Sequence, residues 1–260
     1  MTTQINENNI FATGCSFTWG ESLQFFSGLD SVVWKKIRPS FPDALKTLDE
    51  PQLEFIKNNR WVAQLSKQLG VDYITQARNG GSNLESLLKS EYFYNNQNNI
   101  NSYKIFILQV TDFSRDPIIF KLPNGDVLPI NDASIVNVET EIFGLDNNKI
   151  IYDSYTYFYD KLYQLIEKLE SNDIKTYIIC YPKDAASTLL KHKLQKYHTP
   201  LLYNGNSYNS TDELGESNPM LIVSNYFAEQ NLNFGDNHLT INGHKIISDS
   251  IYTRIITTTK

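Results

Sequence analysis

A serine near the start of the chain stands where a catalytic nucleophile could lie. The stretch "FATGCSFTWGESL", residues 11–23, runs from an apolar segment through Gly14 and Cys15 to Ser16. A hydroxyl directly after a strand can be raised to the rim of a sheet, as in the strand-to-helix elbow of serine esterases. Thr18 stands where the second glycine of the Gly-x-Ser-x-Gly elbow would be, so the match is incomplete. A helix N-cap is the alternative role for this serine.

The base that such a serine needs is predicted near the end of the chain. His238 follows Asp236 in "GDNHLTINGHK", and a carboxylate this close can fix the tautomer of the imidazole and stabilise the imidazolium. The alternative is an Asx-type turn with an exposed histidine. His244 is interpreted as a packing residue of the following helix. His192 and His198 lie among lysines, which favours a solvated helix face.

Two loops could supply the oxyanion donors and the substrate contacts that acyl transfer requires. Gly81 in "NGGS" leaves room for a close approach to its backbone N–H, and the alternative is a simple turn. Asn83, two residues later, is a candidate substrate-binding residue or a helix cap. Thr111 follows the next strand, in "QVTDFSR". Arg115 in the same segment could hold an anionic part of a substrate, or pair with a neighbouring aspartate.

The spacing of potential ligands, the positions of the cysteines and the net charge argue against several other kinds of function. Asp236, His238 and His244 do not have the spacing of a zinc or calcium site, and no lysine follows the glycines as in a phosphate-binding loop, so we expect no metal and no cofactor. Cys15 and Cys180 follow apolar runs and are interpreted as buried free thiols. The net charge is -6 without a basic cluster, which argues against a nucleic-acid partner. The oligomeric state is left open.

The same composition indicates a globular protein outside the membrane. Hydrophobic residues make up 41% and charged residues 20%, and no apolar run approaches the ~20 residues that span a bilayer. The N-terminal stretch lacks the basic and apolar regions of a secretory signal. We therefore expect a cytoplasmic protein without a membrane partner, and a virus-encoded protein in an infected cell fits the same expectation.

Strand and helix signals alternate along the chain. Strands are predicted at 9–15, 71–77, 103–110 and 174–180, and helices at 60–70, 79–94, 155–172, 184–197, 216–231 and 239–256. The alternative for part of the fifth helix, "MLIVSNY", is a strand. Gly70 is expected to end the first helix, and Thr240 to cap the last. This alternation predicts a parallel sheet with helices on both faces, with reactive groups at the carboxyl ends of the strands.

The rhythm changes between residues 112 and 151. "IIFKLPNGDVLPI" predicts a hairpin turning at Pro123–Asp126, because Asn-Gly readily supplies positive φ. We interpret this segment as an inserted hairpin or lid within a single domain of residues 1–260.

These blocks, in this order, resemble the SGNH hydrolases, the GDSL-like esterase and lipase superfamily. Gly14-Cys15-Ser16 is similar to the family's Gly-Asp-Ser block, and "HLTINGH" is similar to its run into the final helix. Cys15 replaces the usual aspartate, and one residue instead of two separates Asp236 from His238. Thr111 stands where the family has an asparagine donor.

The resemblance implies a three-layer α/β/α, flavodoxin-like fold and an esterase mechanism. It implies Ser16 as nucleophile, His238 as base and Asp236 as the orienting acid, with an oxyanion hole formed by Ser16, Gly81 and Thr111. The expected substrate is a small-molecule or glycan ester, such as an O-acetyl sugar. An O-acyltransferase using the same residues is one alternative, and a catalytically weak glycan-binding protein is another.

Overall fold

The centre of the fold is a parallel sheet. The computed structural model describes residues 9–29, 33, 47–78, 81–96, 102–116, 118–121, 127–130, 147–230 and 237–258. Within them, four strands pair in the order β2-β1-β3-β6, and each pair is parallel. Their bounds are β1 (Asn9–Thr13), β2 (Tyr73–Thr75), β3 (Tyr103–Val110) and β6 (Lys175–Cys180). A parallel bridge between Ile178 and His198 continues the sheet beyond β6, so the order is that of a flavodoxin-like fold.

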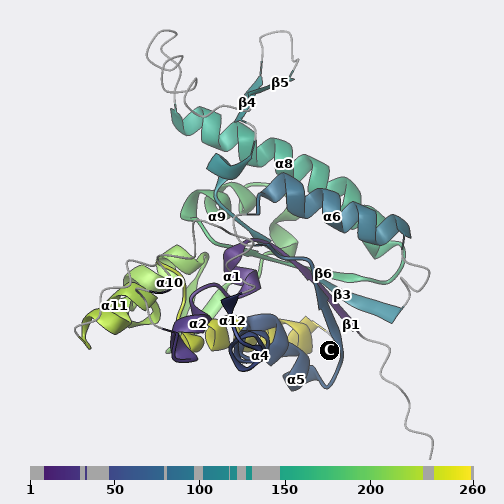
Figure 1. Cartoon of the computed structure of the whole chain (residues 1–260). Coiled ribbons are helices and arrows are strands. Elements are labelled where there is room, and N and C mark those ends of the chain that lie inside the picture. The colour runs from purple at the N-terminus through teal and green to yellow at the C-terminus, as the bar shows by residue number, and fades with distance from the viewer. Residues whose placement is uncertain are drawn as a thin grey trace, which may run out of the picture.

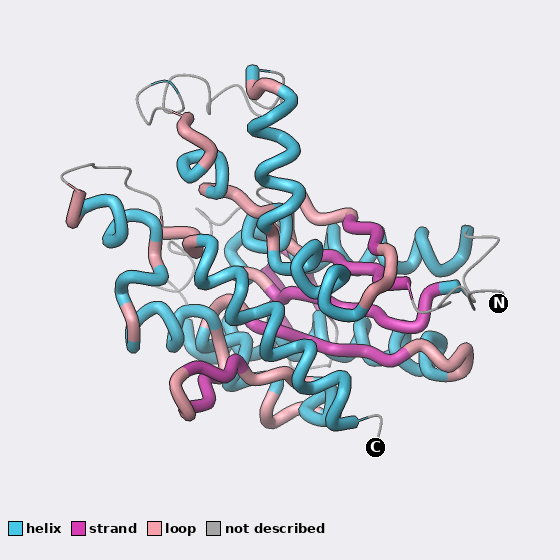
Figure 2. Tube along the Cα trace, turned by 90° about the horizontal axis from the view of Figure 1, so that it is seen from below, coloured by secondary structure: helices cyan, strands magenta, loops and turns pink. Residues whose placement is uncertain are grey.

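Helices cover both faces of this sheet, which confirms the predicted three-layer α/β/α architecture. The face that Figure 1 shows uppermost is covered by α6 (Asn83–Asn96), α8 (Asn147–Glu170) and α9 (Lys183–Leu189). The opposite face is covered by α4 (Glu50–Asn59), α5 (Trp61–Leu69) and α12 (Ile241–Thr258). Figure 2 shows the strands side by side through the middle of the molecule. No helix among the described residues combines the length and the apolarity needed to cross a membrane.

Strand β3 shows why the chain forms two cores. Phe106 and Leu108 are buried in the cluster beneath α8, whereas Ile105 and Ile107 are buried in the cluster beneath α5 and α12. Successive side chains of a strand point to opposite faces, so a continuous apolar run fits a strand that is covered on both sides. The sequence prediction of a central strand at 103–110 is confirmed.

The helix predicted at 60–70 is confirmed as α5, and its apolar side chains lie in the core. Trp61, Val62 and Leu65 of α5 are buried, and Gly70 ends the helix in the left-handed conformation, with φ +67°. Only glycine adopts this conformation without strain. Because Trp61 has no exposed surface, it is a core residue.

Short elements complete the described chain. These are α1 (Ser16–Trp19), α2 (Leu23–Phe26), α10 (Thr211–Ser217), α11 (Val223–Ala228), and the paired strands β7 (Leu201–Tyr203) and β8 (Asn206–Tyr208). The predicted hairpin is present as β4 (Ile118–Lys121) paired antiparallel with β5 (Val127–Ile130), on the outer side of α8 in Figure 1. Its turn at 122–126 lies outside the described residues, and the inserted nature of 112–151 stays a prediction.

Two predicted helices differ from the structure. The helix expected at 184–197 ends at Leu189, and a separate 3-10 helix, Lys193–Tyr197, follows. His192 makes this break, because its Nδ1 accepts a hydrogen bond from Leu194 N and so caps the second segment. The range expected as one helix at 216–231 falls in three elements among the described residues, which are the end of α10, the 3-10 helix Pro219–Leu221 and α11.

Candidate active site

The candidate site lies where the exits of β1 and β3 meet. Strand β1 lies between β2, the next strand in sequence, and β3, so the strand order reverses at β1. Such points of reversal form crevices at the carboxyl ends of parallel strands. Gly14 allows the chain that leaves β1 to lie close to Gln109 of β3. A Cβ at this position would lie 2.9 Å from Gln109 Cβ and would also collide with Thr18 Oγ1, and its φ is +155°. The glycine therefore lets the chain turn into α1 directly above β3.

The structure joins Ser16 and His238, which are 222 residues apart. Ser16 Oγ lies 2.7 Å from His238 Nε2. For the hydroxyl to donate in this bond, Nε2 must carry the lone pair and Nδ1 the proton. Ser16 has no exposed surface, and the His238 side chain is 12% exposed. The hydroxyl is thus positioned to lose its proton to the imidazole in a site that is largely shielded from water.

Backbone hydrogen bonds hold the segment that carries His238. Val223 N donates to His238 O at 2.9 Å, and Thr240 N donates to Leu221 O at 2.8 Å. Thr240 then caps α12, as predicted, since its Oγ1 accepts from Gly243 N at 3.3 Å. The ring of Phe17 packs against the imidazole with the ring centroids 4.5 Å apart. His238 is therefore held from both its backbone and its ring.

A second acid, which the sequence interpretation missed, lies beside this pair. Asp236 lies outside the described residues, so its orienting role stays a prediction. Glu21, however, has no exposed surface, and its Oε2 lies 3.5 Å from His238 Nε2. The signal available in the sequence was an acid placed five residues after Ser16 in an otherwise small and apolar stretch.

The three expected oxyanion donors differ in the hydrogen bonds that they make within the protein. The N–H of Ser16 opens α1, where the first amides of a helix lack intrahelical acceptors. Thr111 Oγ1 is buried and has no hydrogen-bond partner among the described residues. Gly81 lies close to the nucleophile's strand, because a Cβ there would be 3.4 Å from Gly14 O, but its N–H donates to Arg78 O at 3.0 Å. The oxyanion contact from Gly81 stays a prediction and requires this turn bond to open.

Asn83 fixes the end of β3. Its Oδ1 accepts from Thr111 N at 2.7 Å, and its Nδ2 donates to Thr111 O and to Asp116 Oδ2. Asp116 in turn accepts from the backbone N–H of Asn83 and of Leu84, at the start of α6. Burial raises the pKa of Asp116, although these hydrogen bonds act to lower it. The Asn83 amide is thus used inside the protein to position Thr111, and a contact with substrate stays a prediction.

A groove of about 310 Å³ includes Asn237, the residue before His238, in its lining. It is lined by Tyr181, Asp212, Gly215, Glu216, Pro219, Ile222, Asn225 and Asn237. Tyr181 connects the groove to the site, because its ring packs on Phe17 at a centroid distance of 4.1 Å. Burial, followed by the charge of Asp212, raises the pKa of Tyr181 to about 12, and the exposed Arg115 acts in the opposite direction. Arg115 is therefore close enough to Tyr181 for its charge to act on it, and its contact with an anionic substrate stays a prediction.

The other three histidines have structural roles. His244 is buried, as its interpretation as a packing residue requires, and its Nδ1 accepts from Trp61 N at the start of α5. The expectation of a solvated helix face for His192 and His198 is wrong. His198 is buried with Nε2 2.9 Å from Asn209 O, and burial lowers its pKa. His192, with 10% of its side chain exposed, lies 3.2 Å from Asp160. Their lysine-rich surroundings are exposed while the imidazoles fold inward.

Neither cysteine belongs to the site as a reactive thiol. Cys15 and Cys180 are both free and buried, as predicted. Cys15 packs in the core beneath α5 and α12, although it precedes Ser16 directly. Burial raises the pKa of Cys180 to about 12, so this thiol stays protonated. Within the described ranges, no group of three potential ligands is arranged to hold a metal ion.

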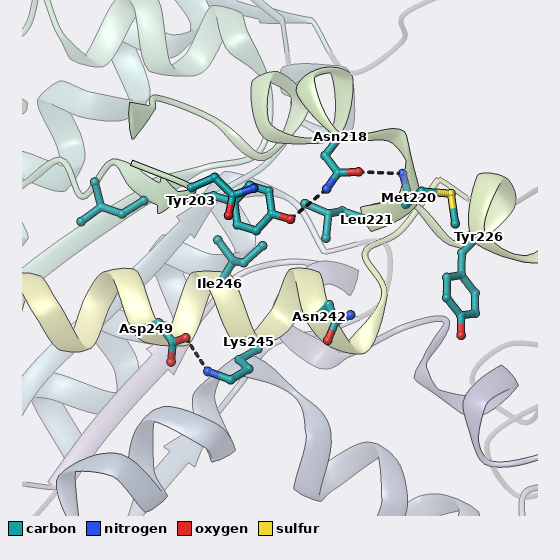
Figure 3. A pocket seen from close by; sticks show the side chains of 11 residues that line it. Tyr203, Asn218, Met220, Leu221, Tyr226, Asn242, Lys245, Ile246 and Asp249 are labelled. Atoms are coloured by element: carbon teal, nitrogen blue, oxygen red, sulfur yellow. Dashed lines mark hydrogen bonds and ion pairs between the residues drawn. The ribbon is translucent and has the colours of Figure 1, made fainter. Parts of the chain in front are cut away.

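A larger cavity of about 510 Å³ lies between β7 and the start of α12 (Figure 3). Four of its polar side chains form two pairs. Asn218 Nδ2 donates to Tyr203 OH at 3.0 Å, and Lys245 pairs with Asp249 at 2.5 Å. Neither Ser16 nor His238 lines it. Neither residue lines the smaller groove, but that groove includes Asn237, the residue before His238, and Tyr181, whose ring packs on Phe17, so we associate the candidate site with it.

The chain was compared with known proteins. No protein-family model matches it, and no curated protein matches its sequence. Among solved structures it is similar to TesA, with a TM-score of 0.46 and 9% identity over 95% of this chain and 98% of that one. It is similar to a lipolytic G-D-S-L family protein from Veillonella parvula (TM-score 0.40, 12% identity, 96% and 98% covered). It is also similar to the acetyl xylan esterase AlAXEase (0.41, 12%, 95% and 99%). Likenesses this distant assign neither a family nor an activity to the chain.

Proposed function

We propose that this chain is a serine hydrolase of the SGNH type, which cleaves a carboxylic ester through an acyl-enzyme. The observation that carries the proposal is the 2.7 Å contact between Ser16 Oγ and His238 Nε2. A nucleophile and a base within hydrogen-bond reach, at the carboxyl ends of parallel strands, are the pair that acyl transfer requires. Asp236 is proposed as the acid that orients the imidazole.

In the first half of the reaction, Ser16 Oγ attacks the acyl carbon while His238 Nε2 takes the hydroxyl proton. The carbonyl oxygen becomes an oxyanion, for which Ser16 N–H, Thr111 Oγ1 and Gly81 N–H are the proposed donors. Collapse of the tetrahedral intermediate breaks the bond to the alcohol oxygen, and His238 delivers its proton to that oxygen. The alcohol leaves, and the acyl group stays on Ser16.

In the second half, water replaces the alcohol. His238 Nε2 takes a proton from the water as its oxygen attacks the acyl carbon, and then returns a proton to Ser16 Oγ as the ester bond breaks. The products are the free carboxylic acid and the original serine. Each step uses the same base and the same donors, so one arrangement serves both halves.

The surroundings of the pair support a short acyl group on a neutral, hydroxylated alcohol. Ser16 is fully buried, which leaves little room for a long acyl chain. The adjoining groove offers an aromatic ring from Tyr181 and the carboxyl groups of Asp212 and Glu216. Burial, with the charge of Glu216 second, raises the pKa of Asp212 to about 6. Carboxyl groups accept hydrogen bonds from hydroxyls and repel anions, so an O-acetylated sugar fits better than a phosphorylated alcohol.

Covalent labelling tests this proposal. A fluorophosphonate probe should label the wild type and fail to label Ser16→Ala, whereas Cys15→Ala, which removes the neighbouring thiol, should still be labelled. Hydrolysis of short-chain aryl acetates should follow the same pattern. Labelling of Ser16→Ala at the wild-type rate would refute the assignment of the nucleophile.

The same experiments separate the alternatives. An O-acyltransferase would release little acid in water and would form a new ester when a sugar acceptor is added. A glycan-binding protein would bind acetylated sugar without being labelled or turning it over. The engagement of Gly81 N–H with Arg78 O is the observation that favours this binding alternative.

A further inference from the structure

The buried carboxylate of Glu21 has no part in the mechanism above. None of the Glu21 side chain is exposed, although glutamate is almost never fully buried unless it is paired. Its Oε2 lies 3.5 Å from His238 Nε2, the nitrogen that Ser16 Oγ also contacts. The acid is therefore beside the atom that gains and loses the proton, on the side opposite to Nδ1, where an orienting aspartate would bind.

The backbone turn that carries Glu21 is strained. Gly20 and Ser22, its two neighbours, both have left-handed φ angles, of +92° and +78°. Ser22 is not a glycine and is fully buried, so its conformation is a strained one. Glu21 N also donates to Ser16 O at 3.0 Å, which ties the acid to the nucleophile's own residue. A tight turn of this kind fixes the carboxylate relative to Ser16.

We propose that Glu21 is a positioning residue that stabilises the His238 imidazolium formed when Ser16 gives up its proton. This inference rests on the proposed function. Before the transfer the imidazole is neutral, and its contact with the carboxylate is no ion pair. After the transfer the proton is on Nε2, and a cation and an anion lie 3.5 Å apart in a buried site. An interaction that is stronger after the transfer than before it lowers the barrier.

The other groups around His238 do not supply this charge. On α12, burial lowers the pKa of His244 to about 3, with smaller contributions from His238 and Arg60, so His244 is neutral. At the end of β6, Tyr181 reaches the site through Phe17, and burial raises its pKa to about 12, so it is neutral as well. Asp236 lies outside the described residues and, in the proposed mechanism, acts at Nδ1.

Glu21→Gln tests the proposal, because it removes the charge and keeps the shape. The first readout is the pH midpoint of the His238 ring signal in an NMR titration, with the signal assigned through its loss in His238→Asn. The midpoint should fall by about 1 to 3 pH units in Glu21→Gln, the usual effect of removing an opposite charge at this distance. Glu54→Gln, the same change on the exposed face of α4, should leave it in place. An unchanged midpoint in Glu21→Gln overturns the proposal.

Kinetics and stability separate positioning from a purely structural role. In Glu21→Gln, kcat for an aryl acetate should fall at least 10-fold with little change in KM, and the acid limb of kcat/KM should move to lower pH. The melting temperature of Glu21→Gln, measured in parallel, shows whether the side chain also stabilises the fold. A lower melting temperature with an unmoved acid limb would indicate a structural residue and overturn the proposal.

If Glu21→Gln does not fold, Glu21→Asp withdraws the carboxylate by one methylene, and the midpoint should fall by a smaller amount. No movement in that variant overturns the proposal. If the wild type is neither labelled nor active, the proposed function fails, and the NMR midpoint still decides whether Glu21 stabilises the charged imidazole.

Discussion

The buried imidazole of His244 should make the stability of the fold depend on pH. His244 has no exposed surface, and its Nδ1 accepts a hydrogen bond from Trp61 N, which helps to begin α5. Burial is the main reason that its pKa is lowered to about 3. In the unfolded chain a histidine titrates near ~6.5. The two states of the protein therefore bind different numbers of protons over a wide range of pH.

The sign and the size of this effect follow from the two pKa values. Above pH ~6.5 neither state binds the proton and the full stability is present, whereas below it the unfolded chain binds a proton that the folded chain excludes. Stability is thus lost as the pH falls, until the folded pKa of about 3 is reached. The whole difference corresponds to about 5 kcal/mol, at about 1.36 kcal/mol per unit. Between pH ~7.5 and ~5 the loss is about 2 kcal/mol.

Urea unfolding of the wild type and of His244→Asn, each at the two pH values, measures this. Asn Oδ1 can still accept from Trp61 N but does not titrate. The variant is expected to be less stable at both pH values because it leaves a cavity. The decisive quantity is the change with pH, which should be about 2 kcal/mol smaller in the variant. His198, whose pKa burial also lowers, is present in both proteins and cancels. Equal losses in the two proteins would refute the reasoning.

Two further predictions concern the exits of β3 and β1. Thr111→Val should lower kcat by about 10² to 10³ if the hydroxyl binds the oxyanion. It should not lower the melting temperature, because Oγ1 has no partner among the described residues. An unchanged kcat would remove Thr111 from the oxyanion hole. Gly14→Ala should cost about 1–3 kcal/mol of stability and displace Ser16, since the new Cβ would collide with Thr18 and Gln109. The matched control is Gly70→Ala, also at positive φ but with nothing within 4 Å, which should keep its activity. Equal activity losses in both glycine variants would contradict the role given to Gly14.

Much of the fold is legible in the sequence because it depends on local patterns. The apolar run of β3, the stop at Gly70 and the cap at Thr240 each result from the chemistry of a few neighbouring residues, and all three are confirmed. The parallel sheet follows from the alternation of strand and helix patterns along the chain. The helix predicted at 184–197 is wrong because its periodic pattern continues past Leu189, whereas the imidazole of His192 turns inward to cap the next segment.

The candidate site likewise has features that the sequence predicts and features that depend on tertiary contacts. The sequence determined that a small hydroxyl residue follows the first strand and that a histidine precedes the last helix, because both are local features of strand exits and caps. Only the tertiary structure decided that these two side chains meet at 2.7 Å, that Asn83 binds the β3 end, and that Glu21 joins them. Such contacts depend on strand order, on the packing at Gly14 and on a strained turn at Ser22. No local pattern encodes them, because each partner comes from a different part of the chain.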